Sequence, residues 1–272
     1  MTHRVRVGVL LSGRGSNMRQ LVAAAHGYVV VAVASDRPDA AGIASARAQG
    51  IPVFAQAPRE AGGKAAFEAV VDGFLRTHGV ELVALAGYMR LLSPAFVARW
   101  PGRILNIHPS LLPLYKGLDT HARALAVGDA EAGCSVHLVT DELDAGTVLG
   151  QARVPVLPGD TADTLAARVL AAEHRLYPRI LSDYARAMTD PLARVRQTAL
   201  ALPEAEEGPG AVFEVAGEPF ARVENGALHV RGAEGWAEMP LGPGADWPAI
   251  DERVARGWEL VAPAGLLEAG GR

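Results

Sequence analysis

The chain has 272 residues, half of them hydrophobic, which allows one large domain or two modest ones and excludes a globally disordered chain. Its formal net charge is −4: residues 191–272 carry seven Arg, no Lys and thirteen Asp or Glu, a balance of −6, and the first 190 residues carry +2. Because the acidic tail lacks the basic face that phosphates need, a nucleic-acid partner is not expected.

Short runs rich in Val, Leu and Ile alternate with Ala-rich stretches of helical spacing over residues 1–189. The runs predicted to be strands are Val5–Leu11, Tyr28–Ala34, Glu81–Ala86, Arg103–Ile107, Cys134–Thr140 and Gln151–Val156. The stretches predicted to be helices are Asn17–Ala25, Gly42–Gln49, Lys64–His78 and Thr161–Ala187. Strands that are apolar on both faces and alternate with helices are typical of a mainly parallel sheet covered on both sides. The fold class predicted for this part is therefore a doubly wound α/β domain.

The first run and the cysteine content bear on the location of the protein. Val5–Leu11 is interrupted by Arg6 and is too short for a signal peptide or a membrane span. Cys134 is the only cysteine, so an internal disulfide is impossible, and its apolar neighbours predict a small buried side chain rather than a nucleophile. A cytoplasmic enzyme with no membrane contact is expected.

The composition changes near Asp190, and residues 190–272 are predicted to form a second, small α+β domain. This part is acidic and rich in Gly and Pro, and it holds three of the four Trp residues, so it has aromatic side chains of its own to bury. Helices are predicted for Leu192–Leu202 and Trp247–Trp258. Short antiparallel strands are predicted for Ala211–Val215, Phe220–Glu224 and Ala227–Val230.

A glycine-containing turn, Ser12-Gly13-Arg14-Gly15-Ser16-Asn17, directly follows the first strand and precedes the first helix. In a doubly wound sheet such a turn lies at the carboxyl end of the strands, where ligands bind, and the free amides at a helix start favour an anion. Its spacing matches neither the dinucleotide fingerprint nor the P-loop. Two interpretations stay open: a phosphate site, or a glycine turn in which Ser16 or Asn17 caps the helix.

Asn106 and His108 are two residues apart in an extended segment, so both point to one face. Pro109 disfavours helix at His108 and helps to keep the segment extended. The amide can donate to a carbonyl oxygen that becomes negative, while the imidazole can move a proton or, when charged, stabilise the same oxygen. A histidine satisfied by the loop backbone is the alternative, and for an isolated histidine it is the better one.

The acidic stretch from Thr140 to Gly146 follows another buried strand. A carboxylate such as Asp144 close to His108 would favour the imidazolium and fix its orientation, although an acidic loop by itself is usually a solvated turn. His121 either lines a pocket or caps the next helix, and His137 is expected to have a structural or supporting role. The histidines and the cysteine show no metal-ligand spacing, so no metal is expected.

Taken together, these stretches resemble the glycinamide ribonucleotide formyltransferases, a folate-dependent family of purine synthesis. The matching motifs occur in the family's order and cover about residues 4–187: Ser12–Asn17, Leu85–Pro94, Asn106–Pro113, Gly117–His121 and Asp141–Asp144. The resemblance implies 10-formyltetrahydrofolate as co-substrate, with the substrate amine attacking the formyl carbon directly. The rivals are a hydrolase of the same fold, a formyltransferase for charged transfer RNA, and a non-catalytic binding module.

The resemblance also implies a role for individual residues. The catalytic group would be Asn106, His108 and Asp144. The ribonucleotide phosphate would be held by Gly15, Ser16 and Asn17, and the glycinamide side would be contacted by Glu173. The folate pocket would be lined by Lys64, Met89, Arg90, Leu91, Leu92, Asn106, Thr140 and Asp141. The departures from the family pattern, which concern affinity and loop rigidity, are Asp119, Ala145, Thr147 and Leu170.

The tail resembles a different family, the MmcQ/YjbR-like domains. The matching pieces are Ala199–Glu207, Phe220–Val223 and Trp258–Pro263. This resemblance implies an antiparallel sheet flanked by helices. Structural packing or contact with a protein partner is the expected role, rather than catalysis.

Overall fold

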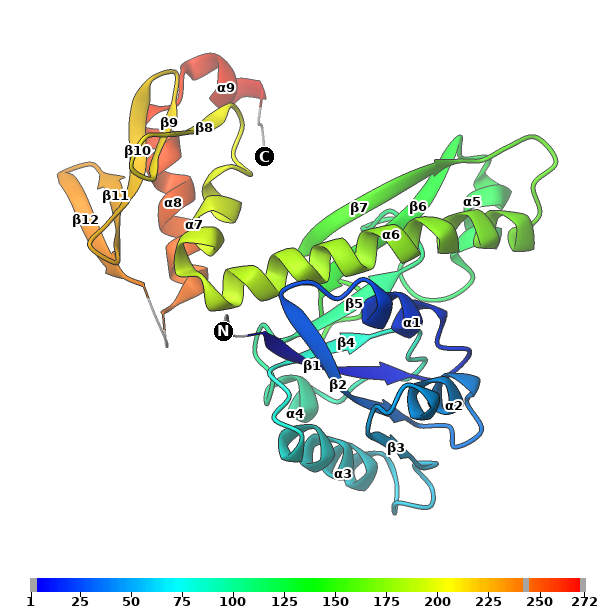
Figure 1. Ribbon diagram of the computed structural model, residues 1–272. Coiled ribbons are helices and arrows are strands. Elements are labelled where there is room, and N and C mark those ends of the chain that lie inside the picture. Colours follow the sequence, from blue (N-terminus) through cyan, green and yellow to red (C-terminus); the bar gives the residue numbers. More distant parts are fainter. Residues whose placement is uncertain (1–3, 242–244, 270–272) are drawn as a thin grey trace. The chain divides into compact units, whose positions relative to one another are not determined.

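The computed structural model describes residues 4–241 and 245–269. The chain forms two compact units, one ending at Ala185 and the other beginning at Arg186 (Figure 1). Within the described ranges, no helix combines the length and the apolar character needed to cross a bilayer.

The first unit contains a seven-stranded sheet in the order β3-β2-β1-β4-β5-β6-β7. Its strands are β1 (Val5–Leu11), β2 (Tyr28–Ser35), β3 (Val53–Ala55), β4 (Leu82–Leu85), β5 (Ile104–His108), β6 (Glu131–Leu138) and β7 (Val148–Pro155). The first five strands pair in parallel, whereas β6 pairs antiparallel with both β5 and β7. The prediction of a mainly parallel sheet is confirmed, and Cys134 is fully buried in β6.

Helices cover both faces of this sheet. They are α1 (Ser16–Ala23), α2 (Ala41–Ala48), α3 (Lys64–Thr77), α4 (Pro94–Val97), α5 (Thr120–Val127) and α6 (Ala162–Thr189). Phe67 of α3 and Phe96 of α4 share a core cluster with Leu10, whereas the turn into α1 lies against Leu11, which points to the opposite face. The long helix α6 runs across the strands (Figure 1), and its Tyr177 hydroxyl lies within hydrogen-bond distance of two strand carbonyls.

The order of the strands determines where a ligand can bind. From β1 the chain moves outward through β2 to β3, and it then returns to β4 on the other side of β1. The loops that leave the carboxyl ends of β1 and β4 therefore diverge, and the crevice between such loops is the usual ligand site of doubly wound sheets. The turn 12–15 and the segment 86–93 lie on the two sides of this point.

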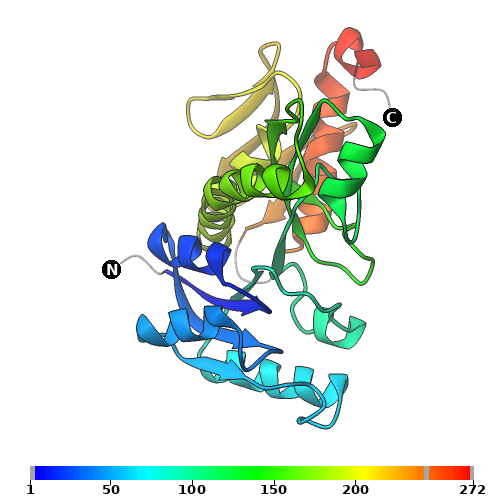
Figure 2. The same cartoon turned by 90° about the vertical axis from the view of Figure 1, so that its right-hand side faces the viewer.

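The second unit is a five-stranded antiparallel sheet in the order β12-β11-β10-β9-β8. Its elements are α7 (Pro191–Ala199), β8 (Ala205–Gly208), β9 (Val212–Val215), β10 (Glu218–Glu224), β11 (Ala227–Gly232), β12 (Gly235–Pro240), α8 (Trp247–Val261) and α9 (Ala264–Ala269). Figures 1 and 2 both show α8 running alongside the sheet, and Val254 and Trp258 from α8 enter a core with Phe213 and Phe220. The predicted helices and strands are present, and β8, β12 and α9 were not predicted.

Candidate active site

The glycine turn after β1 is shaped by close backbone contacts. Gly15 has φ +69°, and a Cβ at this position would lie only 2.6 Å from the Cα of Gly42. Gly15 is the N-cap of α1, and no side chain in the part of the chain that the structure describes caps this helix. The alternative in which Ser16 or Asn17 caps the helix is therefore wrong. The first amides of α1 have no intrahelical acceptor and remain available to an anion.

Asn17 joins this turn to α6. Its Nδ2 donates to Oε2 of Glu173 at 2.7 Å, and both residues are 7% exposed. The Oδ1 atom of Asn17 is buried and has no hydrogen-bond partner among the described residues. Burial raises the pKa of Glu173, and the hydrogen bond from Asn17 only partly offsets this effect. A buried amide oxygen without a donor is costly, so the pair is suited to a ligand that brings an N–H group.

Asn106 and His108 occupy the last residues of β5, where His108 is 5% exposed. The Nε2 atom of His108 lies 3.0 Å from the carbonyl oxygen of Tyr115. A carbonyl can only accept, so this nitrogen carries a hydrogen. The other ring nitrogen, Nδ1, lies 3.4 Å from Oδ2 of Asp144. Both ring nitrogens thus face oxygen atoms that can accept a hydrogen bond.

Asp144 is held from several sides although it belongs to a loop. Its backbone has φ 47°, its side chain is 8% exposed, and Oδ2 accepts a hydrogen bond from the Gly117 amide at 2.9 Å. Burial by itself would raise the pKa of Asp144. Contacts with His137, the Gly117 amide and His108 lower it by more, so the pKa lies below its ordinary value. The side chain is therefore a carboxylate at neutral pH.

His137 connects Asp144 to Asn106. The antiparallel pairing of β5 with β6 places His137 opposite Asn106, and its Nε2 lies 3.1 Å from Nδ2 of Asn106 and 3.5 Å from Oδ1 of Asp144. Its Nδ1 faces the carbonyl oxygen of Leu138 at 2.8 Å. The sequence predicted a structural or supporting role for this residue but did not place it beside Asn106 and Asp144. The structure brings the three residues predicted as catalytic together and adds His137 as a neighbour of Asn106 and Asp144.

The segment after β4 presents apolar side chains to solvent. Met89 is 68% and Leu91 63% exposed, while Leu92 packs against the core cluster beneath α3. Leu118 and Leu143, from two other loops, are also exposed. Exposed large apolar side chains around a crevice are typical of a site that binds an aromatic or apolar ligand.

The remaining residues predicted to line a folate pocket lie on neighbouring elements. Lys64 begins α3, and its Nζ lies 4.0 Å from the Glu68 carboxylate, which also accepts a hydrogen bond from the Ser93 amide at 2.9 Å. Thr140 and Asp141 are exposed after β6. Val139, directly before them, packs on the same core cluster as Leu92.

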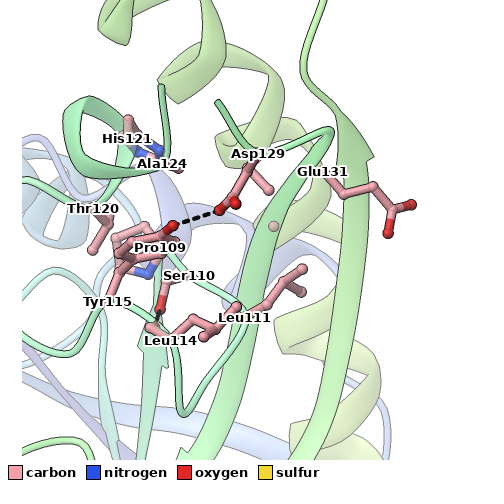
Figure 3. A pocket seen from close by; sticks show the side chains of 12 residues that line it. Pro109, Ser110, Leu111, Leu114, Tyr115, Thr120, His121, Ala124, Asp129 and Glu131 are labelled. Atoms are coloured by element: carbon pink, nitrogen blue, oxygen red, sulfur yellow. Dashed lines mark hydrogen bonds between the residues drawn. The ribbon is translucent and has the colours of Figure 1, made fainter. Parts of the chain in front are cut away.

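A small pocket of about 10 Å³ lies beside the loop that follows His108 (Figure 3). Its wall includes Ser110, Tyr115 and His121, and the Tyr115 hydroxyl donates to the Asp129 carboxylate at 2.6 Å. This volume is suited to about one water molecule. Asp119 is the N-cap of α5, so His121 lines a pocket instead of capping the helix. Burial lowers the pKa of His121, and the nearby His108 lowers it further.

A metal site would need several ligating side chains close together. In residues 4–241 and 245–269, no three His, Cys, Asp or Glu side chains come near enough to hold a metal ion. The polar groups of the site interact with one another and with the backbone.

Comparisons with known proteins give a consistent result for the first unit. The model of the formyl transferase family matches residues 5–181. The phosphoribosylglycinamide formyltransferase of Escherichia coli is 44% identical over 185 residues, which are 66% of this chain and 87% of that protein. The trifunctional purine biosynthetic protein adenosine-3 of Gallus gallus is 42% identical over 184 residues, and the chain spans only 18% of its length.

A solved structure has the same fold. The crystal structure of phosphoribosylglycinamide formyltransferase from Brucella melitensis is 51% identical and superposes with a TM-score of 0.65, covering 67% of this chain and 96% of that chain.

Proposed function

The chain belongs to the formyl transferase family, and from that premise we propose that it transfers the formyl group of 10-formyltetrahydrofolate to the amine of glycinamide ribonucleotide, a step of purine biosynthesis. The observation that carries this proposal is the cluster at the end of β5, in which Asp144 contacts His108 directly and lies within reach of Asn106 through His137. Such a cluster offers donors to an oxygen that gains negative charge, and formyl transfer creates one.

The reaction proceeds in two bond changes. The neutral amine of the substrate forms a bond to the formyl carbon, and the carbonyl oxygen becomes an oxyanion. The bond from that carbon to the folate nitrogen then breaks, and the proton lost by the amine is delivered to this nitrogen. No side chain acts as a nucleophile.

The proposed roles follow from the hydrogen-bonding capacity of each residue. Asn106 has two amide hydrogens. In the His137 tautomer that carries its hydrogen on Nδ1, facing the Leu138 carbonyl, one of them is donated to His137 Nε2 and the second can face the formyl oxygen. His108 provides a positive charge and an N–H group, and Asp144 keeps that charge in place. Losing one such donor typically costs about 3 kcal/mol of barrier.

The glycine turn and α6 support the choice of ribonucleotide. The amides of Gly15, Ser16 and Asn17 would bind the phosphate at the start of α1. Glu173 would accept from the glycinamide side, and the free Oδ1 of Asn17 adds an acceptor beside it. The co-substrate would lie against Met89, Arg90, Leu91 and Leu92.

Lys64, Thr140 and Asp141 would complete the outer part of the folate site, where all three are at the surface. The Lys64 ammonium has the charge that matches the anionic tail of a folate, whereas Thr140 and Asp141 offer oxygen acceptors to its N–H groups. Their contribution is to affinity, because none of them lies in the cluster around His108.

The decisive experiment follows the absorbance of 10-formyltetrahydrofolate with and without glycinamide ribonucleotide. Turnover that requires the ribonucleotide supports the transferase. Equal turnover without it indicates the hydrolase, and no turnover in either case indicates a non-catalytic binding module.

For the second unit we propose an MmcQ/YjbR-like domain that packs or binds a protein partner. The five-stranded antiparallel sheet with α8 on one face supports this assignment. On the other face, Arg222 and Arg231 stack over Trp236 at 4.7 and 5.7 Å. Replacing Trp236 by Ala should leave formyl transfer unchanged, and a loss of transfer would contradict a role separate from catalysis.

A further inference from the structure

Asp36 is a buried carboxylate at the carboxyl end of β2. Its side chain is only 6% exposed. Oδ1 accepts a hydrogen bond from the Ser12 hydroxyl at 2.6 Å, and Oδ2 lies 3.7 Å from the Arg90 guanidinium. A buried carboxylate is retained only where charged or polar partners compensate its desolvation. Here the partners come from two different loops.

Ser12 connects Asp36 to the segment after β4. Its hydroxyl donates to Asp36 and accepts the Met89 amide hydrogen at 2.9 Å. The Ser12 amide in turn donates to the Gly87 carbonyl at 3.0 Å. Asp36 therefore holds Met89 through Ser12 and Arg90 directly, and it fixes both to the end of β1.

A second carboxylate holds the other end of the same segment. Glu68 of α3 accepts from both the amide and the hydroxyl of Ser93. Burial, together with the Asp36 and Glu68 carboxylates, raises the pKa of Tyr88 well above its ordinary value. Residues 89–92 thus run between two fixed points, although Met89 and Leu91 are largely exposed.

We propose that Asp36 is a positioning residue for the co-substrate, holding the Met89 backbone and the Arg90 guanidinium in the arrangement that binds the folate. This inference rests on the proposed function of the segment. It assigns Asp36 no contact with the reacting atoms. Because a prearranged loop binds without first paying an ordering cost, loosening this anchor weakens co-substrate binding more than it slows the chemical step.

Two substitutions separate the interactions of Asp36. Asp36→Asn keeps an acceptor for the Ser12 hydroxyl but loses the charge opposite Arg90, whereas Asp36→Ala loses both. We expect the KM for 10-formyltetrahydrofolate to rise about threefold in the Asn variant and about tenfold in the Ala variant. The KM for the ribonucleotide and kcat should each stay within about 1.5-fold of wild type.

The matched control is Asp39→Ala, because Asp39 lies three residues further along in an exposed ion pair with Arg37. It should leave every parameter unchanged. A cycle with Arg90→Ala gives a second test: Asp36→Asn should add little to the defect of Arg90→Ala, since the two groups act together.

Two measurements other than turnover test the role of Asp36 independently of the proposed enzymatic function. Tetrahydrofolate affinity, measured by titration, should fall in the same order, and the Met89 amide should exchange with deuterium about tenfold faster in Asp36→Ala. If wild type shows no ribonucleotide-dependent transfer, the proposed function fails, and these two measurements still decide the role of Asp36. Unchanged tetrahydrofolate binding and exchange, or an equal rise in both KM values, would overturn the inference.

Discussion

Asp144→Asn isolates the charge of the central carboxylate. The asparagine oxygen can replace Oδ2 and still accept from the Gly117 amide, so the loop keeps its shape. What is lost is a negative charge 3.4 Å from His108 Nδ1. Two unit charges at that distance interact by about 5 kcal/mol at an effective dielectric constant of about 20. Relaxation and partial screening leave roughly 3 kcal/mol, which corresponds to a fall in kcat of about 100-fold.

The assay is steady-state formyl transfer with both substrates varied. Both KM values should stay within about threefold of wild type, because the side chain is 8% exposed and offers little surface to a ligand. Asp163→Asn, an exposed acidic position at the start of α6, is the control and should be unaffected. Since the pKa of Asp144 lies below its ordinary value, the advantage of wild type should persist at neutral pH and fade only as pH falls through that lowered pKa. A kcat within about threefold of wild type would refute the role given to this charge.

Three further outcomes are expected. In Gly15→Ala the alanine must adopt the left-handed backbone that Gly15 has, and its Cβ would clash with Gly42. Calorimetry should therefore show a loss of about 2 kcal/mol in unfolding free energy, with weaker ribonucleotide binding. Burial raises the pKa of Glu173, so its ionised form costs stability at neutral pH. The Glu173→Gln variant should therefore have a higher Tm than wild type at pH 7, and this difference should disappear below the ordinary pKa of 4.5. The same variant should bind the ribonucleotide about tenfold more weakly in a titration. In Gly257→Ala the new Cβ would lie 2.6 Å from a β11 side chain, so urea unfolding followed by Trp fluorescence should show the second unit destabilised by about 2 kcal/mol while formyl transfer is retained.

Strands that consist of a continuous apolar run were predicted well from the sequence. β1 has the predicted bounds because every residue from Val7 to Leu11 is buried, so nothing in the sequence interrupts the signal. β6 begins at Glu131, three residues before the predicted start. Gly133 suggests a turn in the sequence, but in the structure it allows close approach, since a Cβ there would lie 2.1 Å from the Ala152 carbonyl oxygen. β3 has only three residues, all half-buried, and gives no periodic signal.

The candidate site was predictable as far as it depends on strand periodicity. Asn106 and His108 share a face because they are two residues apart in β5. The contact of Asp144 with His108 depends on a loop that holds Asp144 at φ 47°, and local sequence does not determine that conformation. His137 was not assigned to the group because its place opposite Asn106 comes from antiparallel pairing, whereas the pattern of the sequence favours parallel strands. The roles of these residues in catalysis stay predictions.

The hydrogen bond between His108 Nε2 and the Tyr115 carbonyl determines whether this donor would stabilise the bound co-substrate or the transition state. A formyl oxygen that takes the place of the Tyr115 carbonyl exchanges one neutral acceptor for another, so the donor adds little to the affinity for the folate. An oxyanion is a much stronger acceptor, and the same exchange becomes favourable only as the negative charge develops. In the proposed reaction, the interaction of this donor would therefore lower the barrier more than it strengthens the binding of the co-substrate.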